Sequence, residues 1–207
     1  EMLNRDWSSD VCSSDLRERP RNPREAGWGH TFSPCPAALP GASLTRPASR
    51  RMTERWDARR GFPVPRDVAR LLSGVPEWFG REDANAAYIG AARELETWTV
   101  RDAAGTVVGV TLVVRHFPNV AEVHLMVVER GHHGRGVGRA MIEALERDAR
   151  DGGVRLLMVK TLGPSHPDPG YARTRRFHER MGFLPLEETH LWGGDIPCLI
   201  MVKPLTG

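Results

Sequence analysis

Residues 130–139, RGHHGRGVGR, combine backbone freedom with positive charge. Glycines occupy alternate positions, Gly134, Gly136 and Gly138, between an apolar run and a helix-forming segment. The first turn of a helix has unpaired N–H groups and about half a positive charge. Glycines allow the preceding loop to fold tightly and point its own N–H groups into the same concavity. This loop is therefore expected to bind a phosphate group.

Two common phosphate-binding motifs do not fit the spacing. A P-loop needs Lys-Ser/Thr after its last glycine, whereas Gly138 is followed by Arg139 and Ala140. A dinucleotide fingerprint needs G-x-G-x-x-G, whereas the spacing here is G-x-G-x-G. A glycine-rich turn without a ligand is the plain alternative, which the basic neighbours disfavour.

The elements around the loop alternate between strand and helix patterns. In the segment after the loop, Val137, Met141 and Leu145 share one helical face, and Gly152-Gly153 ends the helix. The expected helices are 65–72, 81–95, 136–150 and one that ends at Gly182, and the expected strands are 97–102, 106–117, 121–128, 154–162, 184–192 and 198–205. This order predicts one α/β domain with a mixed sheet over residues 52–207.

Residues 1–51 show neither the period of two typical of strands nor the period of 3.6 typical of helices, and they hold six of the sixteen prolines. Such a segment buries too little apolar surface to offset its chain entropy. The stretch RDWSSDVCSSDL resembles the conceptual translation of a common sequencing adapter. We expect residues 1–51 to be a disordered or non-native extension, and the native protein to begin at Met52.

Composition excludes several classes of protein. The net charge is only +3, without the basic stripe of a nucleic-acid binder. No apolar run approaches the ~18 residues of a membrane span, and the first residues do not resemble a secretory signal. The three cysteines have neither metal nor disulfide spacing, which predicts a cytoplasmic protein without a metal.

The segment VVERGHHGRGVGRAMIEALE resembles the coenzyme A loop of the GNAT family of acyltransferases, with the pattern Gln/Arg-x-x-Gly-x-Gly. His133 stands where Gln or Arg is usual, and Gly136 and Gly138 take the glycine positions. RRFHERMGF is similar to the family's late Phe-Tyr-Glu-x-x-Gly-Phe helix. VPEWFG and LGPSHPDPGYARTR resemble one bacterial branch of unassigned substrate, so the resemblance covers nearly all of residues 52–207.

The resemblance implies a mixed, mostly antiparallel sheet of six to seven strands with about four helices, splayed between the fourth and fifth strands. It implies acetyl-CoA as cosubstrate and, as for many relatives, a homodimer. Arg135 and Arg139 would add charge at the pyrophosphate, or simply be solvated. The residues expected to bind the coenzyme are Met126, Val127, Val128, His133, Gly134, Arg135, Gly136, Val137, Gly138 and Arg139.

Acyl transfer to an amine needs a neutral nucleophile, and deprotonating a lysine-like amine at pH 7 costs about 4.6 kcal/mol. A carboxylate within reach lowers this cost. Glu122 is the expected base, since it lies in phase with His124, Met126 and Val128 and matches a base glutamate of histone-type members. His124 is the second candidate. Alternatively, Glu122 is only a solvated residue at the start of a strand, and His124 is only a packed or hydrogen-bonded structural residue.

Two further residues are expected to act on the acyl group. The resemblance places the N–H of Val128 as the donor to the oxyanion. His178 stands where members often have Tyr, and the spacing of Thr174, Phe177, His178 and Met181 puts it on the inner face of the helix. His178 would then protonate the leaving thiolate, or serve only in packing.

Aromatic residues stand where an acceptor would enter. Trp78, Phe79, Trp192 and His124 are expected to contact it, with core or lid packing as the alternative. We therefore expect an N-acetyltransferase that acts on a primary amine of a small molecule or peptide by direct attack in a ternary complex. The alternative is a coenzyme A-responsive binding or regulatory protein without turnover.

Overall fold

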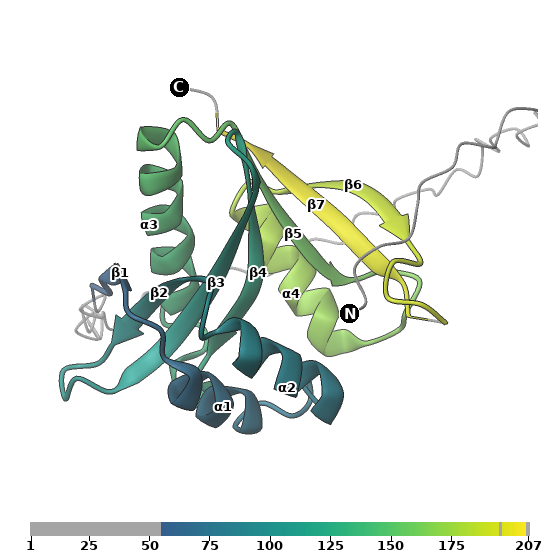
Figure 1. Ribbon diagram of the computed structural model, residues 1–207. Coiled ribbons are helices and arrows are strands. Elements are labelled where there is room, and N and C mark those ends of the chain that lie inside the picture. The colour runs from purple at the N-terminus through teal and green to yellow at the C-terminus, as the bar shows by residue number, and fades with distance from the viewer. Residues whose placement is uncertain (1–54, 195, 206–207) are drawn as a thin grey trace, which may run out of the picture. The chain divides into compact units, whose positions relative to one another are not determined.

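Residues 55–194 and 196–205 are described by a computed structural model of the chain (Figure 1). The expectation for residues 1–51 lies outside this described part. The strands are β1 (Ala58–Gly61), β2 (Glu96–Arg101), β3 (Val107–Phe117), β4 (Val120–Val128), β5 (Leu156–Leu162), β6 (Leu184–Thr189) and β7 (Cys198–Pro204). The helices are α1 (Pro65–Ser73), α2 (Glu82–Ala91), α3 (Val137–Asp151) and α4 (Pro169–Arg180), with a short 3₁₀ turn over Arg130–His132. None of these helices combines the length and apolarity that a membrane crossing needs.

The strands form one seven-stranded sheet in the order β1-β2-β3-β4-β5-β7-β6. Every neighbouring pair is antiparallel except β4 and β5, which are parallel. Figure 1 shows these two strands together near the C-terminal end of the chain and diverging toward the opposite end of the sheet. The structure thus confirms the mixed sheet that the element order predicts and the mostly antiparallel, splayed form that the resemblance implies.

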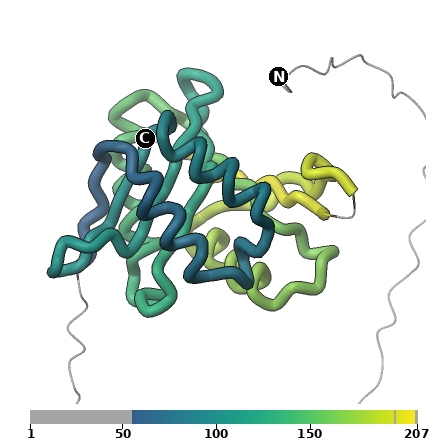
Figure 2. Tube along the Cα trace, turned by 60° about the horizontal axis from the view of Figure 1, so that its bottom comes forward, coloured from purple at the N-terminus to yellow at the C-terminus, as the bar shows by residue number. Residues whose placement is uncertain are grey.

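Helices cover both faces of the sheet. On one face, α3 contributes Met141 and Leu145 to a core that Phe177 of α4 also contacts. On the other face, α1 contributes Leu71 and Leu72 to a second core, against which side chains of α2 pack. Figure 2 shows the blue and teal segment of α1 and α2 crossing one side of the strands. The strand β4 lies between both cores and ends at the glycine-rich loop.

Sequence patterning misses β1. Its residues, ARRG, show no apolar alternation, and Ala58 alone among them is buried. It is an edge strand that pairs with β2 from Ala58↔Val100 to Gly61↔Thr97. Backbone pairing, rather than side-chain burial, therefore accounts for this strand. With β1 included, residues 120–128 form the fourth strand and residues 156–162 the fifth.

Two elements end three or more residues earlier than expected. α2 ends at Ala91 rather than at residue 95, and β6 ends at Thr189 rather than at residue 192. β6 is the outer strand on its side of the sheet, and both of its leucines, Leu184 and Leu186, are exposed. An apolar pattern there does not mark a buried face, because an edge strand is partly held by main-chain bonds.

Candidate active site

The loop between β4 and α3 places main-chain donors at the start of a helix. Gly134 and Gly136 have φ values of 71° and 94°, a region that side chains with a Cβ rarely adopt. Gly136 is the N-cap of α3, and no side chain of the described residues caps it. The first N–H groups of a helix have no intrahelical partner. The donors and the positive end of the helix dipole thus meet at one point.

Gly138 permits close contact between three elements. A Cβ at this position would lie 3.1 Å from Cζ of Phe177 in α4 and 3.8 Å from Sδ of Met126 in β4. Any side chain there would displace the Phe177 ring. The missing Cβ therefore lets α4 and β4 approach the start of α3.

Contacts from outside the loop hold its shape. Trp56 donates a hydrogen bond from Nε1 to the backbone oxygen of Arg135 at 2.9 Å, and the Arg135 guanidinium lies over its ring. Arg130 forms an ion pair with Glu77 at 2.5 Å, which ties the loop to the α1–α2 connection. Sequence reasoning missed Trp56, which belongs to no motif and is distant along the chain. It gave no role to Glu77, although this residue lies in the VPEWFG stretch.

A cavity of about 790 Å³ opens beside the loop, a volume typical of a small-molecule site. Its walls come from β4, the loop, the start of α3, α4 and the α1–α2 connection. Apart from Arg135, every residue expected to bind the coenzyme lines it: Met126, Val127, Val128, His133, Gly134, Gly136, Val137, Gly138 and Arg139.

The edge of β4 opens where β5 diverges from it. The two strands pair at only four positions, residues 120–123 with residues 156–159. On its other edge, β4 is bonded to β3 as far as the N–H of Glu129, which donates to the oxygen of Val108 at 2.8 Å. Adjacent residues of a strand direct their N–H groups to opposite edges. The N–H and carbonyl of Val128 therefore point into the split.

The side chain of His133 lies across this split. Its Nε2 is 2.8 Å from the carbonyl oxygen of Val128. Its ring also contacts Trp78 edge-on, with 5.5 Å between the ring centroids. An imidazole N–H donating to Val128 would satisfy a carbonyl that β5 leaves unpaired. His133 thus joins the loop, β4 and Trp78 at the position where the family pattern has Gln or Arg.

The strand β4 contains a β-bulge at His124. Leu112 of β3 pairs with Leu125, but the next residue, Val113, pairs with Val123, so one residue of β4 is extra. The side chains show the same shift: Val123 joins the core under α3, whereas Leu125 joins the core under α1. In a regular strand, residues two apart would share a face.

The bulge corrects one expectation. Met126 and Val128 pack on the α3 side of the sheet. Glu122 precedes the bulge and neighbours Val123 of the α3 side, so it faces the opposite side. Glu122 is therefore not in phase with Met126 and Val128, and it is not among the residues lining the 790 Å³ cavity. The apolar run VHLMVV does not reveal an inserted residue, because it also fits an unbroken strand.

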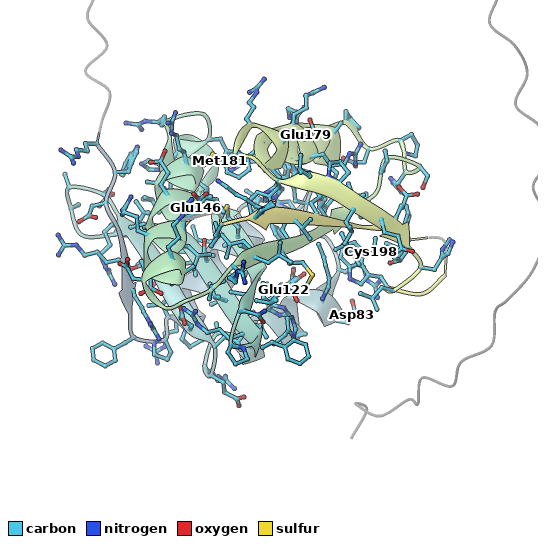
Figure 3. The ribbon with its side chains drawn as sticks, turned by 90° about the horizontal axis from the view of Figure 1, so that it is seen from above. Asp83, Glu122, Glu146, Glu179, Met181 and Cys198 are labelled. Carbon is cyan, nitrogen blue, oxygen red and sulfur yellow. The ribbon has the colours of Figure 1, made fainter. Side chains whose placement is uncertain are left out.

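Glu122 is buried among basic side chains near the middle of the molecule (Figure 3). Its carboxylate accepts hydrogen bonds from Lys160 Nζ at 2.9 and 3.1 Å, lies 2.6 Å from His116 Nε2, and is 3.8 Å from His124 Nδ1. Burial raises the pKa of Glu122, but the contacts with His124, His116 and Lys160 outweigh it and hold the pKa at about 2. A carboxylate with so low a pKa is a poor direct acceptor for an amine proton.

His178 is buried on the inner face of α4, at the wall of the 790 Å³ cavity. Burial lowers its pKa to about 4. About one ring in a thousand would therefore be protonated at pH 7. Its Nδ1 has no hydrogen-bond partner among the described residues. His178 is thus a neutral imidazole with a spare nitrogen, not a charged acid.

A second cavity, of about 430 Å³, is lined by residues of α2, β4, α4 and the loop before β7. The four residues expected to contact the acceptor, Trp78, Phe79, His124 and Trp192, all line it. Trp78, Phe79 and Tyr171 line both cavities, so the two adjoin. The hydroxyl of Tyr171 donates to the backbone oxygen of Trp78 at 2.6 Å, which holds this shared wall.

Potential metal ligands do not gather in the described part of the chain. Within residues 55–194 and 196–205, no group of three or more His, Cys, Asp or Glu side chains could hold an ion. Cys198, the described cysteine, is buried at the start of β7 (Figure 3).

Residues 54–183 match the model of the acetyltransferase (GNAT) family. None of the curated proteins matches the chain. Among solved structures, a GNAT-family protein from Desulfovibrio desulfuricans is 18% identical, with a TM-score of 0.63 over 73% of this chain and 100% of its own. A GNAT acetyltransferase from Elizabethkingia anophelis, with acetyl-CoA bound, is 11% identical, with a TM-score of 0.55 over 73% and 99% of the two chains.

An aminoglycoside 6'-N-acetyltransferase complexed with coenzyme A is 17% identical to the chain. Its TM-score is 0.55, over 69% of this chain and 91% of its own. At such low identities, the likeness to solved structures shows the fold alone.

Proposed function

The chain belongs to the acetyltransferase (GNAT) family, and from this premise we propose that it moves acetyl from acetyl-CoA directly to a primary amine of a small molecule or peptide. The observation that supports this most is the uncapped start of α3, which opens on the 790 Å³ cavity beside β4. A helix N-terminus that follows a glycine-rich loop presents free N–H groups, which suit the oxygens of a diphosphate. The cavity continues from there along the open edge of β4.

The residues around α3 fit a coenzyme A pyrophosphate. N–H groups between Gly134 and Gly138 would bind its oxygens, and glycine at position 136 leaves the approach free of a side chain. Arg135 and Arg139 would add positive charge, although Arg139 also pairs with Glu143 at 2.6 Å. The binding would therefore be mostly a main-chain interaction.

The open edge of β4 suits an extended ligand with amide groups. Because β5 has diverged, the backbone from Met126 to Val128 is available for pairing on that side. Bound acetyl-CoA would supply a thioester carbonyl, which a neutral amine attacks. The N–H of Val128 points into the split and would donate to the acyl oxygen.

We assign acceptance of the amine proton to His124, with Glu122 as a positioning residue. His124 lines the second cavity, and its Nδ1 lies 3.8 Å from the Glu122 carboxylate. A neutral imidazole nitrogen can accept a proton from an attacking amine. Lys160 and His116 hold that carboxylate ionised. Glu122 thus acts through His124 rather than as the direct base.

His178 would contribute a neutral ring to the cavity wall. A thiolate with a pKa of ~8.5 leaves without prior protonation, so departure does not require a charged acid. His178 lines the cavity, but its Nδ1 is buried and has no partner among the described residues. We therefore replace the proton-donor role with packing at the cavity wall.

Calorimetric titration with coenzyme A, together with a thiol-release assay on acetyl-CoA, tests the proposal. We expect binding, a stability gain of about 2.7 kcal/mol when the ligand exceeds its Kd a hundredfold, and thiol release that depends on an added amine. Failure to bind would contradict the proposal. Binding without release from any amine would favour a coenzyme-responsive protein without turnover.

Two expectations about the setting also remain proposals. We propose that the protein acts in the cytoplasm, because its cysteines lack disulfide spacing. We propose that it forms a homodimer, as the family resemblance implies. Sedimentation velocity would test the second, and a monomer at micromolar concentration would contradict it.

A further inference from the structure

The second cavity is walled by aromatic side chains. Resting on the proposed acetyl transfer, we infer that its acceptor is a primary amine with a single positive charge on an aromatic or apolar body. Trp78, Phe79, Tyr88 and Trp192 line the cavity. The Phe79 and Tyr88 rings meet edge-on at 6.0 Å, and Tyr88 meets the His124 ring at 5.5 Å. Walls fixed by such contacts favour a flat or apolar group.

The charges of the lining point the same way. Arg81 is the one permanently ionised side chain among its described residues, and no described Asp or Glu lines the cavity. A polyamine or an aminoglycoside has several ammonium groups, and each is costly to desolvate without a paired anion. The cavity therefore disfavours a polycation and tolerates one ammonium group.

The buried carboxylate next to His124 is already neutralised. Glu122 lies behind His124, but Lys160 is bonded to both of its carboxylate oxygens. Glu122 thus does not provide net negative charge for a second ammonium group. Charge in this region is balanced before any ligand enters.

The lining offers few polar contacts for the body of the acceptor. Asn85 donates from Nδ2 to the oxygen of Phe79 at 2.8 Å, and its Oδ1 is buried, as is Nε1 of Trp78. Sugar-like ligands need many such groups. The mostly aromatic and aliphatic lining therefore suits a ligand with few polar substituents.

A pair of amines that differ only in a second charge tests the inference on the full-length protein. Hexylamine, hexamethylenediamine, phenethylamine and kanamycin are compared by thiol release from acetyl-CoA. We expect kcat/KM for hexylamine to exceed that for the diamine by about tenfold, because no carboxylate in the described lining can pair with the second ammonium group. Phenethylamine should be at least as good a substrate as hexylamine, and kanamycin the poorest.

Matched variants locate the preference in the cavity. Arg81→Glu should reduce the hexylamine-to-diamine ratio severalfold, whereas Arg59→Glu should not. Both arginines are exposed and pair with an aspartate two residues away, but Arg59 lies outside both cavities. Trp192→Ala should lower kcat/KM for phenethylamine, and Phe62→Ala, an exposed aromatic elsewhere, should leave it unchanged.

The outcomes separate this inference from the acetyltransferase function. A preference for the diamine or kanamycin would overturn the inference and leave the transfer reaction intact. Coenzyme binding without release by any of the four amines would also overturn it. Failure to bind coenzyme A would instead contradict the proposed function itself.

Discussion

Glu122 and Lys160 form an ion pair inside the sheet, where two hydrogen bonds of 2.9 and 3.1 Å join the groups. Removing one partner of such a pair leaves the other charge buried and unpaired. Contacts with His124, His116 and Lys160 together hold the pKa of Glu122 at about 2. A pH–rate inflection near neutrality would therefore belong to another group.

Glu122→Gln should lower kcat about tenfold while leaving the KM for acetyl-CoA unchanged, because the residue contacts His124 and not the coenzyme cavity. Steady-state kinetics over both substrates measures this split. A merely structural role would instead reduce the amount of folded enzyme and leave kcat per folded molecule unaltered. Calorimetric coenzyme affinity is the control for folding.

The two perturbed groups should produce separate losses of stability in acid. The pKa of His178 is lowered to about 4 in the folded state, so an unfolded chain binds more protons between pH 6.5 and 4. Stability should fall by about 3 kcal/mol across that window as the pH decreases. Glu122, whose pKa is lowered to about 2, should add a similar loss between pH 4.5 and 2.

Urea unfolding at a series of pH values checks this assignment. His178→Phe should flatten the dependence of the unfolding free energy on pH between pH 6.5 and 4. It should preserve the loss of stability at lower pH, because Glu122 is unchanged. An unchanged slope in the upper window would show that His178 is not buried in its neutral form.

At the scale of elements, β4 serves both cavities because of its bulge. Before the extra residue, Glu122 faces the α2 side; after it, Met126 and Val128 face the α3 side. His124 lines the second cavity, whereas Val128 lines the first. One strand thus brings a candidate base and a candidate oxyanion donor to opposite sides of the same split.

Gly136→Asp should abolish coenzyme A binding. A side chain and a negative charge would intrude at the N-cap of α3, at a φ of 94° that strains any residue with a Cβ. The matched control is Gly105→Asp, since Gly105 has a φ of 84° in a hairpin outside both cavities. Both variants share the backbone strain, so equal coenzyme affinity in titrations of the two would refute the placement.

Trp56→Phe should weaken coenzyme A binding about threefold to tenfold. The change keeps an aromatic ring but removes the 2.9 Å hydrogen bond from Nε1 to the oxygen of Arg135, a contact worth roughly 1 kcal/mol. The control is Trp98→Phe, which also removes an indole hydrogen bond, here to Glu96, but at a position away from the loop. Its affinity for coenzyme A should remain near that of the wild type. Similar losses in both variants would mean that Trp56 acts only on global stability.

At the scale of the whole molecule, one sheet that opens at β4 and β5 places two cavities side by side. Trp78, Phe79 and Tyr171 are common to both linings. An acyl donor in the first cavity and an amine in the second would meet at this shared wall. Such an arrangement needs no covalent enzyme intermediate, and the described cysteine, Cys198, is buried outside both linings.

Initial-rate kinetics should accordingly show a ternary complex. Double-reciprocal plots at several amine concentrations should intersect, because both substrates bind before acetyl moves. Parallel lines would indicate an acetylated enzyme and would contradict direct transfer. Acetyl-CoA with no amine provides the control, and we expect no burst of thiol.

Local features of the sequence determined most of the fold. Apolar runs identified β3, β4 and β5, and the spacing of Gly134, Gly136 and Gly138 identified the loop, because such patterns and glycine conformation depend on near neighbours. The edge strand β1 escaped notice, since it buries almost nothing and is held by main-chain bonds.

The sequence by itself thus determined the α/β order, the glycine-rich helix start and the inner face of α4. Only the tertiary structure decided the side chains' partners: Lys160 bonds to Glu122 across 38 residues, and Trp56 bonds to the loop across 79. It also decided the bulge at His124 and the neutral state of His178. The reason is physical: strand register, burial and pKa depend on groups that come together only when distant segments pack.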